Sequence, residues 1–191
     1  MINVPPSYVY IFALMILEGM SLPIPSEVVM PLVGYYSTKG LIDPLVGLLV
    51  GTMGSLIGSI IDYMVALKLG VPFLRKYGWA FKLNDEKLDA LNMWFSKYGL
   101  QSVFLFRFVP VFRALISFPA GLSRMNVSLF IIATFLGHLI WDSALVYIGI
   151  RFASTWETLI ALIDQYLYIV AVVISIVIVA YILIKGNFLK F

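Results

Sequence analysis

The sequence predicts an all-α integral membrane protein built as an inverted repeat, with two opposed re-entrant helical hairpins, glycine-rich transmembrane helices and a C-terminal transmembrane helix. Three observations lead to this fold class. Of the 191 residues, 62% are apolar and 12% are charged, whereas a soluble domain carries about a quarter charged residues. Two apolar segments contain both prolines and charged side chains. Finally, GSIIDYMVALKLG at 58–70 resembles GHLIWDSALVYIG at 137–149.

The first half of the chain contains one full span, preceded by two shorter apolar stretches. Crossing a bilayer takes about 20 apolar residues, so the stretch at 8–17 is too short to cross. The next stretch, at 22–36, is also short and is interrupted by three prolines. We therefore expect a re-entrant segment at 18–38 and a transmembrane helix over 41–69, which together make a first repeat at 8–70.

The second half of the chain repeats this order. Segment 100–122 is long enough to cross, but it holds two arginines and two prolines. We expect it to enter the membrane and return, as a second re-entrant segment. A span at 127–150 completes a second repeat at 99–150. A cleanly apolar stretch then predicts a C-terminal transmembrane helix over 166–185, and the chain as a whole (1–191) is expected to be one membrane domain.

The most polar segment, 71–98, separates the two repeats and is predicted to be a cytoplasmic linker. Asn84 can cap a helix whose first turn carries Asp85 and Glu86, which are favourable near the positive end of the helix dipole. Apolar residues then recur at helical spacing, at Leu88, Leu91, Phe95 and Tyr98. This pattern predicts an amphipathic helix on the membrane surface.

The lysines and arginines predict the orientation, because basic residues concentrate in cytoplasmic loops. Of the 13 basic residues, nine would lie inside, two outside and two within the membrane. This places the central loop and the C-terminus in the cytoplasm of a multi-pass protein of the cell membrane. It requires segment 100–122 to return to the side from which it entered. No cleavable signal peptide is expected at the N-terminus.

Charged residues in the predicted membrane segments are the candidate site, since each costs at least about 2.5 kcal/mol to insert and such residues usually mark a pathway. Arg107 and Arg113 stand in RFVPVFR. In a continuous helix their side chains would point about 120° apart. Pro110 breaks that helix and allows both to reach one cavity. Glu18 and Glu27, in EGMSLPIPSE, lie in the opposing segment.

Two interpretations of these charges remain open. The acids and arginines could form an ion-pair network that holds the two segments together. Alternatively, the arginines grip an anion, because guanidinium groups match phosphate oxygens in pairs, while the acids carry protons or gate the arginines. Asp62 is a further candidate for the site. Asp62 and Asp142 both lie late in their spans, where capping or surface positions compete with a functional role.

Other sequence features favour ordinary structural roles. A ridge of small residues, Gly47, Gly51, Gly54 and Gly58, is typical of close helix packing. His138 is the only histidine and there is no cysteine, so we expect a hydrogen-bonded core histidine, no metal site and no cofactor. Ser55 and Ser59 have no recognisable nucleophile context, and no basic, aromatic face indicates nucleic-acid binding. We therefore expect a protein that is not an enzyme.

The sequence resembles the DedA family of bacterial and archaeal membrane proteins, which is related to SNARE-associated Golgi and VTT-domain proteins. The resemblance covers about residues 10 to 150. It rests on Glu18, on PIPSE at 23–27, on the glycine-rich span ending in DYMVALKLG, and on FRFVPVFR followed by FPAGLSRM, Gly137 and Trp141. Thr134 departs from the family pattern, because many relatives carry asparagine three residues before this glycine.

The resemblance implies a function for the charged residues. Family members are described with two opposed re-entrant helices, and several are implicated in returning polyprenyl-phosphate carrier lipids across the membrane. The family's essential acids and arginines fall on Glu18, Glu27, Arg107 and Arg113. We thus expect a proton-linked flippase for a carrier such as undecaprenyl phosphate. A non-selective phospholipid scramblase and a proton-coupled exporter of small ions or drugs remain alternatives, and a homo-oligomer is compatible with the sequence.

Overall fold

The computed structural model describes residues 7–70, 85–109 and 112–155, and all regular structure in these ranges is helical. Residues 1–151 and 152–191 form two compact units, and each is described by itself. Within the second unit the described residues form one short 3-10 helix, η3 (Ala153–Thr155). The C-terminal helix expected over 166–185 lies outside the described residues. One membrane domain over 1–191 stays a prediction.

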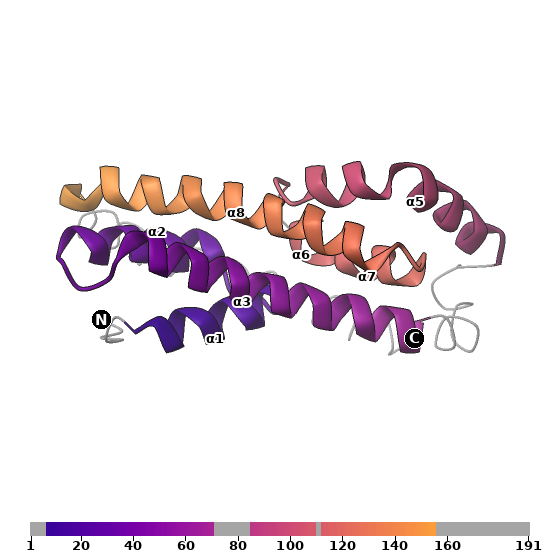
Figure 1. Ribbon diagram of the computed structural model, residues 1–191, viewed down its shortest axis with the longest axis horizontal. Helices are drawn as coiled ribbons and strands as arrows, with labels where there is room; N and C mark the ends of the chain where they lie inside the picture. The colour runs from indigo at the N-terminus through magenta and orange to yellow at the C-terminus, as the bar shows by residue number, and fades with distance from the viewer. Residues whose placement is uncertain (1–6, 71–84, 110–111, 156–191) are drawn as a thin grey trace, which may run out of the picture. The chain divides into compact units, whose positions relative to one another are not determined.

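Two long antiparallel helices, α3 (Pro44–Val65) and α8 (Val127–Arg151), run through the first unit (Figure 1). Asp43 caps α3, since its side chain accepts a hydrogen bond from the backbone N–H of Val46 at 2.9 Å. A π-helical turn, η1 (Ala66–Gly70), follows α3. The two helices have 22 and 25 residues, or about 33 and 38 Å at 1.5 Å per residue. Both are therefore long and apolar enough to cross a membrane.

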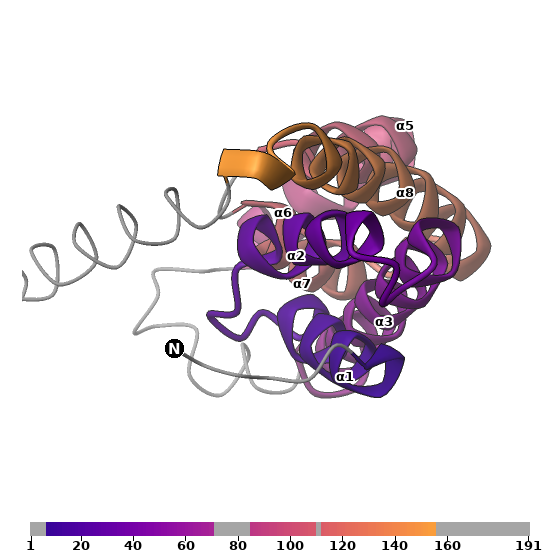
Figure 2. The ribbon, with the colours of Figure 1, turned by 90° about the vertical axis from the view of Figure 1, so that its left-hand side faces the viewer.

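Two groups of helices, short except for α5 with its 22 residues, flank opposite ends of this long pair (Figure 1). Helices α1 (Tyr8–Gly19) and α2 (Ser26–Thr38) lie beside one end. Helices α5 (Asp85–Phe106), α6 (Phe112–Leu115) and α7 (Ser117–Leu122) lie beside the other. Seen end-on, α2 lies between α1 and α8 (Figure 2). The loops that connect the short helices therefore face the middle of the unit.

Each group of short helices packs on both long helices. Helix α1 packs on α3, whereas α2 packs mainly on α8; helix α5 packs on α8, whereas α7 packs on α3. Glycines allow the backbones to touch. A Cβ added at Gly58 would overlap the backbone of α1 at Ile16 and Gly19, and one at Gly149 would overlap the Pro31 carbonyl of α2. The predicted role of the glycine ridge in close helix packing is confirmed.

The prolines of the first segment do not all interrupt helices. Pro23 and Pro25 precede α2, as expected, but Pro31 lies inside it. Pro31 therefore interrupts the apolar stretch of the sequence but not the helix. Proline removes one backbone donor, but a packed neighbour can compensate for this loss. Here α8 packs directly against the Pro31 backbone through Gly149.

The predicted linker and the second re-entrant segment share one helix. Helix α5 runs without interruption from Asp85 to Phe106, so the expected boundary between residues 98 and 99 falls inside it. Gly99, at this boundary, faces Met125, and an added Cβ there would lie 3.1 Å from the Met125 sulfur. Helix α5 thus continues through residue 99, where it packs tightly against the turn before α8. The predicted cap residue Asn84 lies outside the described residues.

The glycine contacts predict a graded response to added methyl groups. We expect Gly58→Ala to lower the free energy of unfolding by about 1–3 kcal/mol, because overpacking against a backbone cannot relax easily. Gly51→Ala is the matched control, since its Cβ would clash only with the flexible Met30 side chain and would meet Ile11 at an ordinary contact distance. Thermal unfolding in detergent micelles measures both, and equal unfolding temperatures for the two variants would contradict this account.

Candidate functional site

An ion pair joins the end of α1 to α6 at the middle of the unit. Arg113, on α6, donates from one terminal nitrogen to Glu18 Oε1 at 2.6 Å, and Glu18 lies at the end of α1. Both side chains are about 95% buried. The other Glu18 oxygen accepts a hydrogen bond from the Ser55 hydroxyl at 2.9 Å. Glu18 therefore ties the end of α1, which the first loop (residues 20–25) follows, to α6, which lies after the second loop (described over residues 107–109).

Glu27 is the weaker and more open partner of Arg113. Its Oε1 atom lies 3.4 Å from the second terminal nitrogen of Arg113, and its side chain is 45% exposed. Such a long, partly solvated pair contributes little to stability. Arg113 also lies over the ring of Trp141, with 5.4 Å between the guanidinium carbon and the ring centroid. The guanidinium is thus clamped firmly on the Glu18 side and loosely on the Glu27 side.

Arg107 is also buried, but unlike Arg113 it has no ion-pair partner within the described ranges. It is 1% exposed, and one terminal nitrogen donates to the backbone carbonyl of Arg113. The other donates to the hydroxyls of Ser117 at 3.0 Å and Thr134 at 3.2 Å. Arg107 therefore holds the backbone that carries Arg113.

Two residues of α8, Gly137 and Phe130, lie against Arg107. A Cβ on Gly137 would lie 2.8 Å from the Arg107 side-chain stem, so only glycine allows this approach. The guanidinium also lies 5.9 Å from the Phe130 ring centroid, within the range of a cation–π contact. The residue that departs from the family pattern, Thr134, contributes one of the hydroxyl acceptors. Pro110, which was expected to place the two arginines, lies outside the described residues, although α5 ends just before Arg107.

Asp62 joins the same region through Ser21. The Ser21 hydroxyl lies 2.6 Å from Asp62 Oδ2 and 3.0 Å from the backbone oxygen of Ala114. Its single proton can serve one of these acceptors at a time. Ser21 has a φ of +57°, a left-handed conformation that is uncommon for a residue other than glycine. Glu18, Glu27, Asp62, Arg107 and Arg113 thus form one charged cluster where the two loops meet.

A stripe of polar residues on α3 was not anticipated from the sequence. Its members recur every three or four residues, so they share one helix face: Thr52, Ser55, Ser59 and Asp62. Each has a different hydrogen-bond partner. Thr52 bonds Asp142 at 2.9 Å and Ser55 bonds Glu18 at 2.9 Å. Ser59 bonds His138 at 3.3 Å and Asp62 bonds Ser21 at 2.6 Å. The helical spacing of these polar residues could have indicated the stripe, but the glycines between them suggested only close helix packing.

Two residues of α8 that contact the stripe can be compared with their predictions. His138 is 1% exposed and lies beside Ser59, which confirms the prediction of a hydrogen-bonded core histidine. Asp142 is 0% exposed, so the alternative of a surface or capping acid is wrong. Asp62, at 6% exposed, is likewise not a surface acid. Asp142 is buried because α2 and α3 both pack on α8, and Thr52 of α3 reaches its carboxylate.

Several buried donors at the charged cluster lack acceptors. Within the described part of the chain, no acceptor lies in hydrogen-bonding reach of Arg113 Nε, Arg107 Nε or Trp141 Nε1. Buried donors normally have partners. Trp141 and Arg113 are already in contact, so their free N–H groups lie in the same neighbourhood. An anion with several oxygens could supply the missing acceptors there. Among the described residues, no three His, Cys, Asp or Glu side chains could jointly hold a metal ion.

Comparisons with known proteins point to one family. The model of the VTT domain matches residues 24–151. A Lactococcus lactis (strain IL1403) relative called "Alkaline phosphatase-like protein" is 35% identical over 90% of this chain and 82% of its own length. "Undecaprenyl phosphate transporter A" of Staphylococcus aureus is 34% identical over 90% of this chain and 87% of its own length. The Bacillus subtilis protein of the same name is 35% identical over 85% and 82%. No solved structure matches the chain.

The two acids that face Arg113 should contribute unequally to stability. We expect Glu18→Ala to cost about 3–5 kcal/mol, because it leaves a buried guanidinium without its counter-ion. Glu27→Ala should cost less than about 1 kcal/mol, because its pair is long and partly solvated. Chemical or thermal unfolding of both variants in the same detergent measures the difference. Equal losses of unfolding free energy in the two variants would contradict the conclusion that the buried acid contributes more to stability than the exposed one.

Proposed function

The chain belongs to the VTT-domain (DedA) family, and from that premise we propose that it is a flippase that moves a polyprenyl-phosphate carrier lipid, such as undecaprenyl phosphate, across the cell membrane. It is an all-helical membrane protein with two helices long enough to span a bilayer. The transporter names of the S. aureus and B. subtilis relatives support the substrate class. They also agree with the expectation that the protein is not an enzyme.

The observation that carries this proposal is the set of unsatisfied donors beside Arg113. A phosphate group would accept hydrogen bonds from Arg113 Nε and Trp141 Nε1, which otherwise lack acceptors among the described residues. It would enter on the Glu27 side, where the 3.4 Å contact is weak and the carboxylate is 45% exposed. Glu27 would be displaced, whereas Glu18 would continue to hold Arg113 from the buried side.

The proposal divides the work between the two arginines. Arg113 contacts the phosphate, because part of its guanidinium is free. Arg107 has both terminal nitrogens occupied and bonds the Arg113 carbonyl, so it positions Arg113. Asp62 holds the first loop through Ser21 and sets where the two loops meet. The five predicted site residues thus take binding, gating and positioning roles.

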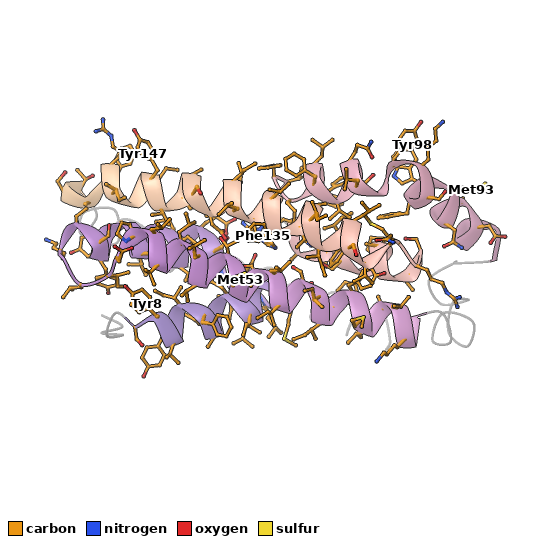
Figure 3. All side chains as sticks on the ribbon, in the orientation of Figure 1. Tyr8, Met53, Met93, Tyr98, Phe135 and Tyr147 are labelled. Atoms are coloured by element: carbon orange, nitrogen blue, oxygen red, sulfur yellow. The ribbon has the colours of Figure 1, made fainter. Side chains whose placement is uncertain are left out.

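The isoprenoid tail would remain in the bilayer beside the helices. Large apolar side chains are exposed along the middle of the two long helices, namely Leu49, Met53, Leu136 and Ile140. Figure 3 shows Met53 and Phe135 near the centre of the unit, between Tyr8 and Tyr147 towards one end and Met93 and Tyr98 towards the other. A headgroup inside the protein with a tail outside avoids moving apolar chains through the polar cluster.

We further propose that the two groups of short helices are re-entrant hairpins of an inverted repeat. The exchange of packing between α2 and α7 supports this, because each lies on the long helix of the opposite half. Movement of one loop against the other would open the cluster to alternate sides. The basic residues support a topology with the central loop and C-terminus in the cytoplasm.

Arg113→Lys tests phosphate gripping directly. We expect flipping of polyprenyl phosphate in liposomes to fall about 10- to 100-fold, because lysine keeps the charge but loses the paired donors. The matched control is Arg151→Lys, which makes the same change at an exposed position at the end of α8. Labelled phospholipid is followed in the same vesicles.

The possible outcomes separate the candidate functions. Wild-type rates in Arg113→Lys would refute phosphate gripping. Equal movement of both lipids in the wild type would identify a scramblase. Ion flux in vesicles without carrier lipid would identify an exporter.

Proton linkage is tested at the exposed acid. Only the ionised form of Glu27 can compete with phosphate for Arg113, so we expect wild-type flux to respond to a pH gradient. Glu27→Gln, which cannot exchange a proton, should flip lipid with little response to that gradient. Asp89→Asn is the matched control, since it removes an exposed carboxylate from α5. A full wild-type response in Glu27→Gln would exclude Glu27 as the linked group.

A further inference from the structure

A pocket of about 440 Å³ lies between α5 and the turn that joins α7 to α8. None of its lining residues belongs to the charged cluster. Its lining includes two cations, Lys97 and Arg124, two amides, Gln101 and Asn126, and two leucines, Leu100 and Leu129. No aspartate or glutamate lines it. The pocket therefore has a net positive lining with an apolar side.

The two cations of this surface pocket are available to a ligand. Both side chains are exposed, and neither has an ion pair in the described part of the chain. Lys97 lies over the Tyr98 ring, at 5.1 Å from its centroid. Gln101 contributes an exposed amide. Helix α8 begins at Val127, beside the pocket, and its positive dipole end adds to the field.

Arg124 has a left-handed backbone conformation, in which glycine is the favoured residue. Its φ is +52°. The backbone N–H of Arg124 bonds the Gly121 oxygen, and that of Met125 bonds the Ala120 oxygen. This pair of bonds is a Schellman motif, in which glycine is the favoured residue at the Arg124 position. Turn formation alone thus favours glycine over arginine here, and the turn itself gives no reason for the guanidinium.

The surroundings indicate a lipid headgroup in particular. Leu100 and Leu129 are exposed at the pocket, where they could contact the first carbons of an acyl or isoprenoid chain. Trp94 and Tyr98, with ring centroids 5.0 Å apart, lie on the same stretch of α5. Figure 3 shows Tyr98 and Met93 pointing outward from this helix. Exposed tryptophan and tyrosine are typical of the headgroup level of a membrane.

We propose that this surface pocket binds the phosphate of an anionic lipid headgroup, with Lys97 and Arg124 as its cationic contacts. The role of the pocket in transport rests on the proposed function. The pocket would hold a phosphate lipid at the membrane surface before or after the lipid binds at the charged cluster. The phosphate could belong to the carrier lipid, to an ordinary phospholipid or to free phosphate, and the recognition chemistry is the same in each case.

Native mass spectrometry of the purified full-length chain tests this directly. The probes are polyprenyl phosphate, phosphatidylglycerol, the uncharged-overall phosphatidylcholine, and inorganic phosphate as competitor. We expect Arg124→Gly and Lys97→Gln each to weaken binding of the anionic lipids about fivefold, the effect of one basic residue at a membrane surface. Phosphatidylcholine binding should not change. Arg151→Gln, which removes an exposed charge elsewhere, should bind as the wild type does.

Arg124→Gly also controls for folding. Because glycine suits the left-handed conformation, its unfolding temperature should equal or exceed that of the wild type, so lost binding cannot come from a damaged turn. Wild-type binding in Arg124→Gly, or an equal loss in Arg151→Gln, would overturn the proposal. Displacement by inorganic phosphate would assign recognition to the phosphate group itself. A lack of displacement would assign it to the lipid headgroup, and either result supports the pocket.

The test is independent of the flippase proposal. If the wild type fails to flip polyprenyl phosphate in liposomes while Arg124→Gly still weakens lipid binding, the proposed function fails and the surface pocket stands. If flipping is intact and Arg124→Gly binds normally, the surface pocket fails and the flippase stands.

Discussion

The buried ion pair between Arg113 and Glu18 is the contact on which the rest of the site depends. It joins the end of α1 to α6 across the point where the two loops meet, at 2.6 Å and with little exposure of either side chain. Removing one partner from such a pair is costly, because the other charge stays buried. Arg107 and Ser55 hold the two partners from behind. A mobile Arg113 would lose both its orientation and its ability to present free donors.

Close helix packing makes this burial feasible. Gly58 and Gly149 bring α1 and α2 onto the long helices with direct backbone contact, and Gly137 gives the stem of Arg107 its space. The polar stripe on α3 then supplies hydroxyls for groups that would otherwise be unsatisfied at this depth, including Asp142 and His138. Glycines for backbone approach and hydroxyls for polar partners alternate on the same helix. The helix is therefore both a packing surface and a source of hydrogen bonds.

The division between a tightly held and a loosely held side of Arg113 suits a binding site better than a purely structural clamp. A clamp would bury and pair every donor, whereas here Arg113 Nε and Trp141 Nε1 lack partners among the described residues and Glu27 is half-exposed. The proposed surface pocket adds a second cationic position at the turn between α7 and α8. Two cations of different burial could then serve one phosphate at successive positions, Arg124 at the surface and Arg113 within.

The sequence by itself determined the membrane class, the two long spans and the five charged residues of the cluster, because composition, length and intramembrane charge are local properties. Tertiary structure decided what each charge does. Arg107 and Arg113 look equivalent in RFVPVFR, yet only one has an acidic partner within the described residues. Pro31 interrupts an apolar stretch of the sequence, yet α2 continues through it where α8 packs against its backbone. Asp142 reads as a span-end acid, yet α2 and α3 cover its helix. The ion pairs of Arg113, the burial of Asp142 and the packing at Pro31 depend on contacts between residues 86 to 118 positions apart (Arg113–Glu27 to Gly149–Pro31), which no local pattern contains.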